Sequence, residues 1–174
     1  MAGSLFGRKQ IIPMKNILTL DQLPNLIKKL KLQSKSIVLV GGCFDILHIG
    51  HITFLEKAKK EGDILLVMLE SDKSIQERKG ITRPIHTRSE RAHILSQLRL
   101  VDFIVLLPHM TSDKAYEKVV KMIQPAIIAV TKGDNGISKK RQQAKKFGAT
   151  LKIVTNHIAN ASTTHLLELL QKEL

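Results

Sequence analysis

Five short runs of Ile, Leu and Val, separated by stretches with helical spacing, constrain the fold of this chain more than any other feature. These runs predict strands over residues 36–40, 63–69, 102–107, 126–131 and 151–155. Strands this apolar are typical of a parallel sheet that helices cover on both faces. Strict alternation of strands and helices favours the same arrangement. We therefore predict an α/β fold with a single Rossmann-like, doubly wound, five-stranded parallel sheet.

The stretches between the strands complete the predicted domain. Apolar residues recur in them every three or four positions, which predicts helices over residues 21–32, 50–60, 88–98, 113–123, 137–147 and 162–172. Residues 71–85 contain Gly80 and Pro84 and are expected to form a loop with a short helical piece. We expect one domain over residues 15–174 and a disordered leader over residues 1–14.

The net charge narrows the classes of partner. The chain has 28 Lys and Arg against 15 Asp and Glu, a formal net charge of +13. A basic surface attracts nucleic acids, anionic membranes or phosphorylated small ligands. Stacking aromatics are scarce, with five Phe, one Tyr and no Trp, which argues against nucleic acid. The apolar runs are too short to span a bilayer, which argues against a membrane partner. The single cysteine, Cys43, excludes an intrachain disulfide and fits a cytoplasmic location.

The turn after the first predicted strand carries the strongest functional signal. It reads Gly-Gly-Cys-Phe-Asp-Ile-Leu-His-Ile-Gly-His over residues 41–51. Glycines let a backbone turn sharply and approach a ligand closely, and the first N–H groups of the following helix attract phosphate oxygens. His48 and His51 are three residues apart, so they share one face of that helix. Imidazoles there can donate hydrogen bonds to phosphate oxygens as charge builds up during displacement at phosphorus.

Two other interpretations of these histidines stay open at the level of the sequence. One is a pair of incidental histidines with no function. The other is a zinc site, which needs a third ligand such as Cys43 or Asp45. The sequence has no other compact cluster of His and Cys, so we predict no metal site built from the protein's own side chains.

The pattern Gly-x-Phe-Asp-x-x-His-x-Gly-His over residues 42–51 resembles the signature of the cytidylyltransferase-like nucleotidylyltransferases. Within that family, the chain is most similar to the domain that adenylylates heptose 1-phosphate. The resemblance implies that His48 and His51 are catalytic. It also implies nucleotide contacts from other residues of the same turn, namely Gly42, Cys43, Phe44, Asp45, Ile49 and Gly50.

The same resemblance extends to positions after the later strands. It implies that Lys79 is catalytic and neutralises the leaving pyrophosphate. It implies further nucleotide contacts from Asp72, Arg91, Lys132, Gly133, Asp134, Ser162, Thr163 and Thr164. One departure concerns the base: the heptose-type pattern Lys-Gly-Gly-Asp is replaced by Thr-Lys-Gly-Asp over residues 131–134. The aliphatic Leu167, three residues after the last threonine, argues against the phosphopantetheine branch.

These features predict transfer of AMP or CMP from a nucleoside triphosphate to a phosphorylated acceptor, with release of pyrophosphate. Mg²⁺ is expected to arrive with ATP or CTP. A sugar phosphate such as heptose 1-phosphate is the favoured acceptor, and glycerol 3-phosphate and FMN are alternatives that relatives use. Relatives often form homodimers, which leaves that assembly open here. A non-catalytic nucleotide or RNA binder on the same fold is the alternative from another class.

Overall fold

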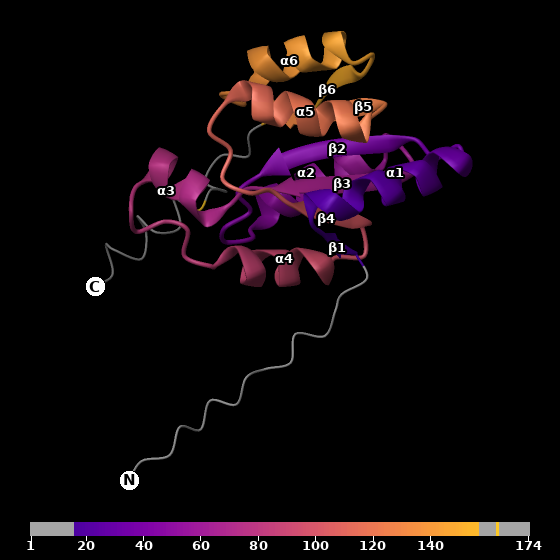
Figure 1. The fold of residues 1–174 in the computed structure, drawn as a ribbon. Coiled ribbons are helices and arrows are strands. Elements are labelled where there is room, and N and C mark those ends of the chain that lie inside the picture. The colour runs from indigo at the N-terminus through magenta and orange to yellow at the C-terminus, as the bar shows by residue number, and fades with distance from the viewer. Residues whose placement is uncertain (1–15, 157–162, 164–174) are drawn as a thin grey trace.

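The computed structural model describes residues 16–156 and residue 163. These residues form a parallel six-stranded sheet with strand order β1-β4-β3-β2-β5-β6. The strands are β1 (Ile17–Leu18), β2 (Ile37–Gly42), β3 (Ile64–Leu69), β4 (Phe103–Leu106), β5 (Ile127–Thr131) and β6 (Thr150–Thr155). Figure 1 shows the sheet with α3 beyond one end of its strands. The predicted Rossmann-like α/β class is therefore confirmed.

The strand count differs from the prediction by one. The extra strand, β1, pairs with β4 at the edge of the sheet, with Ile17 opposite Ile104. Two residues are too few to show a periodic pattern, and only pairing within the folded sheet makes this segment a strand.

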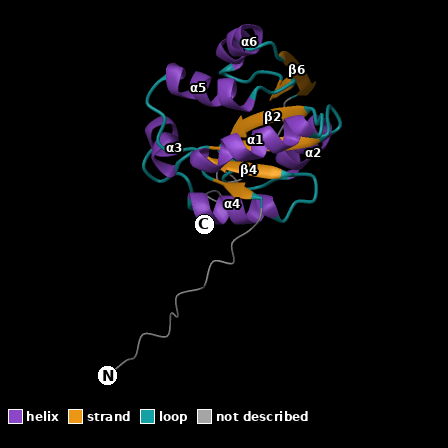
Figure 2. Cartoon of the chain, turned by 45° about the vertical axis from the view of Figure 1, so that its right-hand side comes forward, coloured by secondary structure: helices purple, strands orange, loops and turns teal. Residues whose placement is uncertain are grey.

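Helices cover both faces of the sheet, as Figure 2 shows. Their bounds are α1 (Leu23–Leu32), α2 (Ile49–Lys59), α3 (Asp72–Lys79), α4 (Arg88–Ser96), α5 (Asp113–Ile123) and α6 (Ile137–Lys146), with a 3₁₀ turn, Leu20–Gln22, before α1. The expected leader over residues 1–14 and most of the expected helix over residues 162–172 lie outside the described residues. No helix in the described part of the chain has the length and apolar character needed to cross a membrane.

Two apolar layers hold the helices on the sheet. One layer joins α1, α5 and α6 to the sheet through residues such as Ile27, Val120 and Ala144. The other joins α2 and α4 to the opposite face through Leu55 and Leu95. Neighbouring strand residues alternate between the two layers, and each fully buried Leu, Ile or Val contributes about 1.5–3 kcal/mol. This explains why the strands are apolar throughout.

The strand order fixes where a ligand can bind. β2 lies between β3 and β5, so the chain runs from β2 to one side of the sheet and returns later on the other side. Loops diverge at such a switch point and leave a crevice beyond the carboxyl ends of the strands. Gly41 and Gly42 are the last two residues of β2, the strand next to this crevice.

Candidate active site

The last residue of β2, Gly42, lies where the geometry requires glycine. A Cβ on Gly42 would lie 2.9 Å from Cε2 of Phe44. Phe44 itself has a φ of 45°, and its ring lies 5.2 Å from the ring of His51, centroid to centroid. Gly42 therefore allows the aromatic ring to fold back over the strand end and to pack beside the imidazole.

The two histidines occupy the start of α2. His48 is the N-cap residue, and its carbonyl accepts hydrogen bonds from the N–H groups of His51 and Ile52, at 2.9 and 3.2 Å. The imidazole rings stack with a centroid distance of 3.8 Å and an interplanar angle of 28°. The predicted sharing of one helix face is therefore realised as direct ring contact.

His51 is electrically neutral at physiological pH. Burial lowers the pKa of His51 to about 4, and the positive charges of His48 and Lys79 act in the same direction. A hydrogen bond with the backbone of Ile46 and the nearby Asp45 carboxylate raise the pKa of His51 only in part toward its usual value. A neutral imidazole donates from one ring nitrogen only. A bound polyanion would favour its protonation, because an opposite charge nearby stabilises the charged form.

Asp45 ties the turn to the loop before α4. Its carboxylate forms a buried ion pair with Arg83, at 2.6 Å from Nη2. The backbone N–H groups of Ile85 and His86 donate to the other oxygen at 2.8 and 3.1 Å. Asp45 was expected to contact the nucleotide. Both of its oxygens are engaged within the protein, and the residue also lines the smaller of the two cavities described below.

Arg91 joins three segments beneath the site. Its side chain has no exposed surface, and its guanidinium donates to the carbonyls of Cys43, Glu70 and His86 and to the carboxylate of Asp72, at 2.5–3.1 Å. A buried guanidinium with these partners fixes the ends of β2 and β3 relative to each other. The nucleotide contact predicted for Arg91 has no exposed surface to form through in this conformation.

Helix α3 presents Lys79 to the site. Ser71 caps the helix by accepting from the N–H of Ser74, and Asp72 in its first turn also accepts from the N–H of Arg88 at 3.1 Å. Lys79 is the last residue of α3. The expected loop over residues 71–85 thus contains a helix of eight residues that directs its basic end toward the histidines.

The turn after β5 is organised around Asp134. Its Oδ1 accepts from the N–H of Gly136 at 2.8 Å, and its Oδ2 pairs with Lys140 at 2.6 Å. Gly133 has a φ of +83°, which a side chain would strain. Lys132 is exposed and lines neither of the two cavities described below.

Two cavities open on either side of the Gly41–Cys43 turn. The smaller, about 190 Å³, is lined by Phe44, Asp45, His51, Lys79, Thr131 and Thr163. The larger, about 730 Å³, lies between α3, α5 and α6. Gly41, Gly42, Cys43, Ala129 and Asp134 line both. The two cavities therefore meet at the carboxyl ends of β2 and β5.

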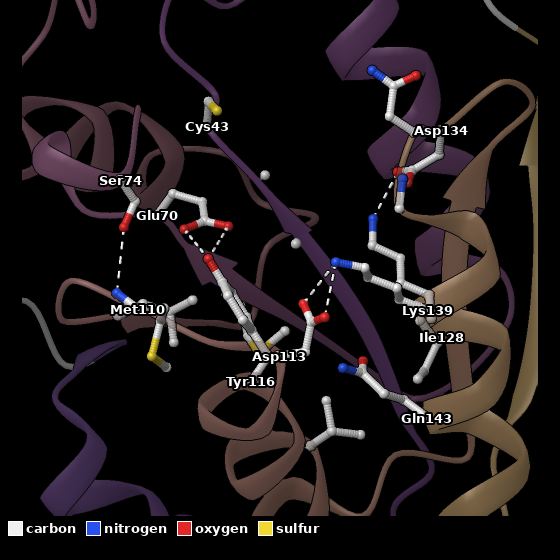
Figure 3. Close-up of a pocket in the computed structure, with 18 of the residues that line it drawn as sticks. Cys43, Glu70, Ser74, Met110, Asp113, Tyr116, Ile128, Asp134, Lys139 and Gln143 are labelled. Atoms are coloured by element: carbon white, nitrogen blue, oxygen red, sulfur yellow. Dashed lines mark hydrogen bonds and ion pairs between the residues drawn. The ribbon is translucent and has the colours of Figure 1, made fainter. Parts of the chain in front are cut away.

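The larger cavity has a polar wall and an apolar floor, and Figure 3 shows the polar wall. The hydroxyl of Tyr116 points at both carboxylate oxygens of Glu70, at 3.0 and 2.8 Å. Opposite them, Lys139 of α6 pairs with Asp113 of α5 at 2.8 Å. The floor consists of residues such as Leu39, Met68 and Ile128. A ligand with one apolar face and several polar groups fits this lining.

Most, but not all, predicted site residues line these cavities. Those lining the smaller one are Gly42, Cys43, Phe44, Asp45, His51, Lys79, Asp134 and Thr163, and Gly133 lines the larger. His48 stacks on His51 instead, whereas Ile49 and Gly50 in the first turn of α2 line neither cavity. Ser162 and Thr164 lie outside the described residues. The hydroxyl of Thr163 donates to the carbonyl of Ile46 at 3.4 Å.

The described residues contain no group of three His, Cys, Asp or Glu side chains placed to hold a metal ion. The two carboxylates at the smaller cavity are engaged, Asp45 by Arg83 and Asp134 by Lys140. The zinc interpretation of the histidines therefore gains no third ligand from this part of the chain.

Sequence reasoning missed the polar wall of the larger cavity. Glu70, Tyr116 and Asp113 belong to no motif, and Tyr116 is 46 positions from Glu70 in the chain. The only available signal was the position of Glu70 directly after a predicted strand, where ligands bind in this architecture.

The family model for cytidylyltransferase-like proteins matches residues 39–164. The chain belongs to the cytidylyltransferase-like nucleotidyltransferases. Among curated relatives of this nucleotidyltransferase, the bifunctional protein HldE of Geotalea uraniireducens is 35% identical over 87% of this chain and 30% of its own length. The bifunctional protein HldE of Aliarcobacter butzleri is 36% identical over 90% of this chain and 31% of its own length. The chain thus spans about a third of these relatives.

Two solved structures resemble this nucleotidyltransferase. A lipopolysaccharide core biosynthesis protein from Thermoplasma volcanium has a TM-score of 0.57 and 30% identity, covering 71% of this chain and 97% of its own. The pantoate-beta-alanine ligase of Francisella tularensis has a TM-score of 0.62 and 18% identity, covering 80% and 66%. The second likeness concerns the fold alone. The family resemblance drawn from the His-x-Gly-His signature is confirmed.

Proposed function

We propose that this nucleotidyltransferase transfers AMP, or less readily CMP, from the triphosphate to the phosphate of a sugar phosphate such as heptose 1-phosphate, and releases pyrophosphate. The observation that carries the proposal is the meeting of two unequal cavities at one turn, next to the stacked imidazoles. A nucleotidyl transfer needs such a junction, because the acceptor oxygen must attack the α-phosphorus of the triphosphate from the side opposite the leaving pyrophosphate.

In this proposal the smaller cavity seats the triphosphate. Lys79 supplies positive charge there, and Thr163 supplies a hydroxyl. We assign Ser162 and Thr164, next to Thr163 in the sequence, to the same phosphates. The turn of residues 131–134 then faces the nucleoside. Mg²⁺ is expected to accompany the triphosphate and to neutralise part of its charge.

The acceptor occupies the larger cavity and attacks in line. An oxygen of its phosphate forms a bond to the α-phosphorus, while the bond from the α-phosphorus to the bridging oxygen of pyrophosphate breaks. His48 and His51 donate hydrogen bonds to the α-phosphate oxygens, on which negative charge increases. No covalent enzyme intermediate forms. The cationic end of α3 receives the leaving pyrophosphate.

The proposal includes a preference among acceptors. The polar wall of the larger cavity, which includes Glu70, Asp113, Tyr116 and Lys139, favours an acceptor with several hydroxyl groups, such as a sugar phosphate. The HldE relatives and the lipopolysaccharide core biosynthesis protein support the same direction. A cytoplasmic location is part of the proposal, since the single cysteine favours it.

A matrix of triphosphates against phosphorylated acceptors tests the proposal. The full chain is incubated with ATP or CTP and with heptose 1-phosphate, mannose 1-phosphate, glycerol 3-phosphate or FMN, and pyrophosphate release is measured. We expect release with ATP and a sugar 1-phosphate, and none when the acceptor is omitted. If the protein binds a nucleotide or RNA but releases no pyrophosphate with any combination of triphosphate and acceptor, it is a non-catalytic binder and the proposal is wrong.

A further inference from the structure

We propose that Glu70 is a specificity-determining residue of the larger cavity, where its carboxylate recognises a hydroxyl group that neighbours the acceptor phosphate. This inference rests on the proposed function and assigns a selective group to the acceptor side of the same site. Three observations support it: the backbone hydrogen bonds of Glu70, the contacts of its carboxylate with Tyr116 and Arg78, and its place in the lining of the larger cavity.

The backbone of Glu70 is fixed independently of its side chain. Its N–H donates to the carbonyl of Gly42 at 3.2 Å, and its carbonyl accepts from Arg91 at 2.8 Å. Only 8% of the residue is exposed, yet it lines the larger cavity. These backbone hydrogen bonds would hold the strand end whatever the side chain at residue 70. A buried carboxylate is therefore not needed for the fold here, and burying its charge costs free energy unless it is compensated.

Tyr116 orients the carboxylate. Its hydroxyl lies 2.8 Å from one oxygen of Glu70 and 3.0 Å from the other. Burial and the Glu70 carboxylate raise the pKa of Tyr116 well above its usual value, so the phenol keeps its proton and donates. One hydroxyl has a single proton to donate, whereas an ionised carboxylate accepts at about four positions. Glu70 therefore keeps accepting capacity toward the cavity.

Arg78 places a cation between this carboxylate and the turn after β2. Its Nη2 lies 3.4 Å from Oε1 of Glu70 and 4.0 Å from Sγ of Cys43, and its Nε donates to the carbonyl of Ser74 at 3.0 Å. The polar groups thus run in the order Cys43, Arg78, Glu70, Tyr116. An acceptor phosphate is attracted to the guanidinium beside the turn and repelled by the carboxylate behind it.

Like Arg78, which pairs with Glu70, the two lysines of the larger cavity are paired with carboxylates. Lys139 pairs with Asp113, and Lys140 pairs with Asp134. With the acceptor phosphate at Arg78, the Glu70 carboxylate lies on the side of the phosphate that faces away from the turn. There it can accept a hydrogen bond from the acceptor. A sugar 1-phosphate matches this order, because a hydroxyl group lies on the carbon next to the phosphorylated one. A deoxy analogue leaves the buried carboxylate short of a donor, which costs about tenfold or more in binding.

The decisive variant is Glu70→Gln, which keeps the size of the side chain and an oxygen that accepts from Tyr116. Kinetics of pyrophosphate release are measured with ATP, with mannose and heptose 1-phosphates, and with their monodeoxy derivatives. In the wild type we expect at least one deoxy derivative to lose about tenfold or more in kcat/KM. In Glu70→Gln we expect that ratio to fall toward one, with the KM for ATP unchanged. Glu56→Gln, an exposed change on α2, should keep the wild-type ratio.

A second variant keeps the test decisive if Glu70→Gln is too unstable to assay. Tyr116→Phe removes only the hydroxyl that orients the carboxylate, and it should lower the same ratio by a smaller factor. An unchanged ratio in whichever variant folds, or an equal rise in KM for ATP and for the sugar phosphate, would overturn the assignment of Glu70. Wild-type protein that releases no pyrophosphate with any sugar phosphate would instead overturn the proposed function, and the role of Glu70 with it.

Discussion

The two cavities that flank β2 differ in how their polar groups are assembled. In the smaller one, Phe44, Asp45 and His51 come from one continuous segment, and Lys79 and Thr163 complete the lining. In the larger one, Glu70, directly after β3, and charged residues of α3, α5 and α6 meet across the space. The contrast suggests that the two cavities have different roles. In the proposed function, the smaller cavity, built from residues close in sequence, carries out the nucleotidyl transfer, and the larger cavity, built from residues far apart in sequence, selects the acceptor.

The largest effect is expected from His51→Ala. Loss of one hydrogen-bond donor to the developing charge costs about 10²–10³ in turnover, and the fold should persist because α2 is held by Leu55 and Ala58. Pyrophosphate release measures the loss, and circular dichroism checks the fold. His93→Ala, an exposed change on α4, is the matched control. Wild-type turnover in His51→Ala would show that the histidine of the smaller cavity has no part in catalysis. The proposed difference in role between the two cavities would then be wrong.

A pH-dependent loss of stability should originate in the smaller cavity. The pKa of His51 is about 4 in the folded protein against 6.5 for an unperturbed histidine. The unfolded chain therefore binds more protons between these values, and stability falls as the pH drops through that window. At pH 5 the contribution is on the order of 2 kcal/mol relative to pH 8.

Urea unfolding of the wild type and of His51→Gln at both pH values measures this contribution. The difference between the two proteins should shrink or reverse toward low pH, since glutamine does not titrate. Equal pH profiles would show that His51 is as easily protonated in the folded protein as in the unfolded chain.

A smaller effect separates two adjacent glycines at the junction of the cavities. In Gly42→Ala the new methyl group would lie 2.9 Å from the ring of Phe44, whereas in Gly41→Ala the nearest atom is Cε of Met68 at 3.6 Å, an ordinary contact. We expect Gly42→Ala to lose on the order of 1 kcal/mol of stability and to displace the ring beside His51. Thermal unfolding and pyrophosphate release compare the pair. Equal behaviour would mean that Phe44 moves freely.

The smallest effect should come from Lys139→Ala. The ion pair between Lys139 and Asp113 crosses the larger cavity, but both side chains are more than half exposed. Exposed pairs contribute about 0–1 kcal/mol, so the melting temperature should barely change. A large destabilisation would show that the two helices depend on this pair, and that the larger cavity is less pre-formed than the smaller one.

The sequence contained enough information for the α/β fold class and for the family of the chain. Apolar runs such as residues 63–69 predicted strands because burial on both faces leaves no polar positions. The His-x-Gly-His turn was predictable because its residues are neighbours in the chain. Strand β1 was not, since two residues carry no periodicity.

The walls of the larger cavity could not be predicted for a different reason. The pairing of Glu70 with Tyr116 depends on where α5 packs, which no local pattern encodes. Arg91 illustrates the same limit: its family position suggested a nucleotide contact, yet packing of α4 encloses it completely. The catalytic roles of the predicted residues stay predictions until turnover is measured.

The enclosed guanidinium of Arg91 has a consequence for catalysis. It holds the backbone on which the triphosphate would rest and the backbone that carries Glu70, so the seats of both substrates are set when the chain folds. Substrates arriving at such a scaffold find it already ordered, and little of their binding energy is used to immobilise it. More of that energy then remains to stabilise the transition state, in which the acceptor phosphate and the leaving pyrophosphate are both partly bonded to the α-phosphorus.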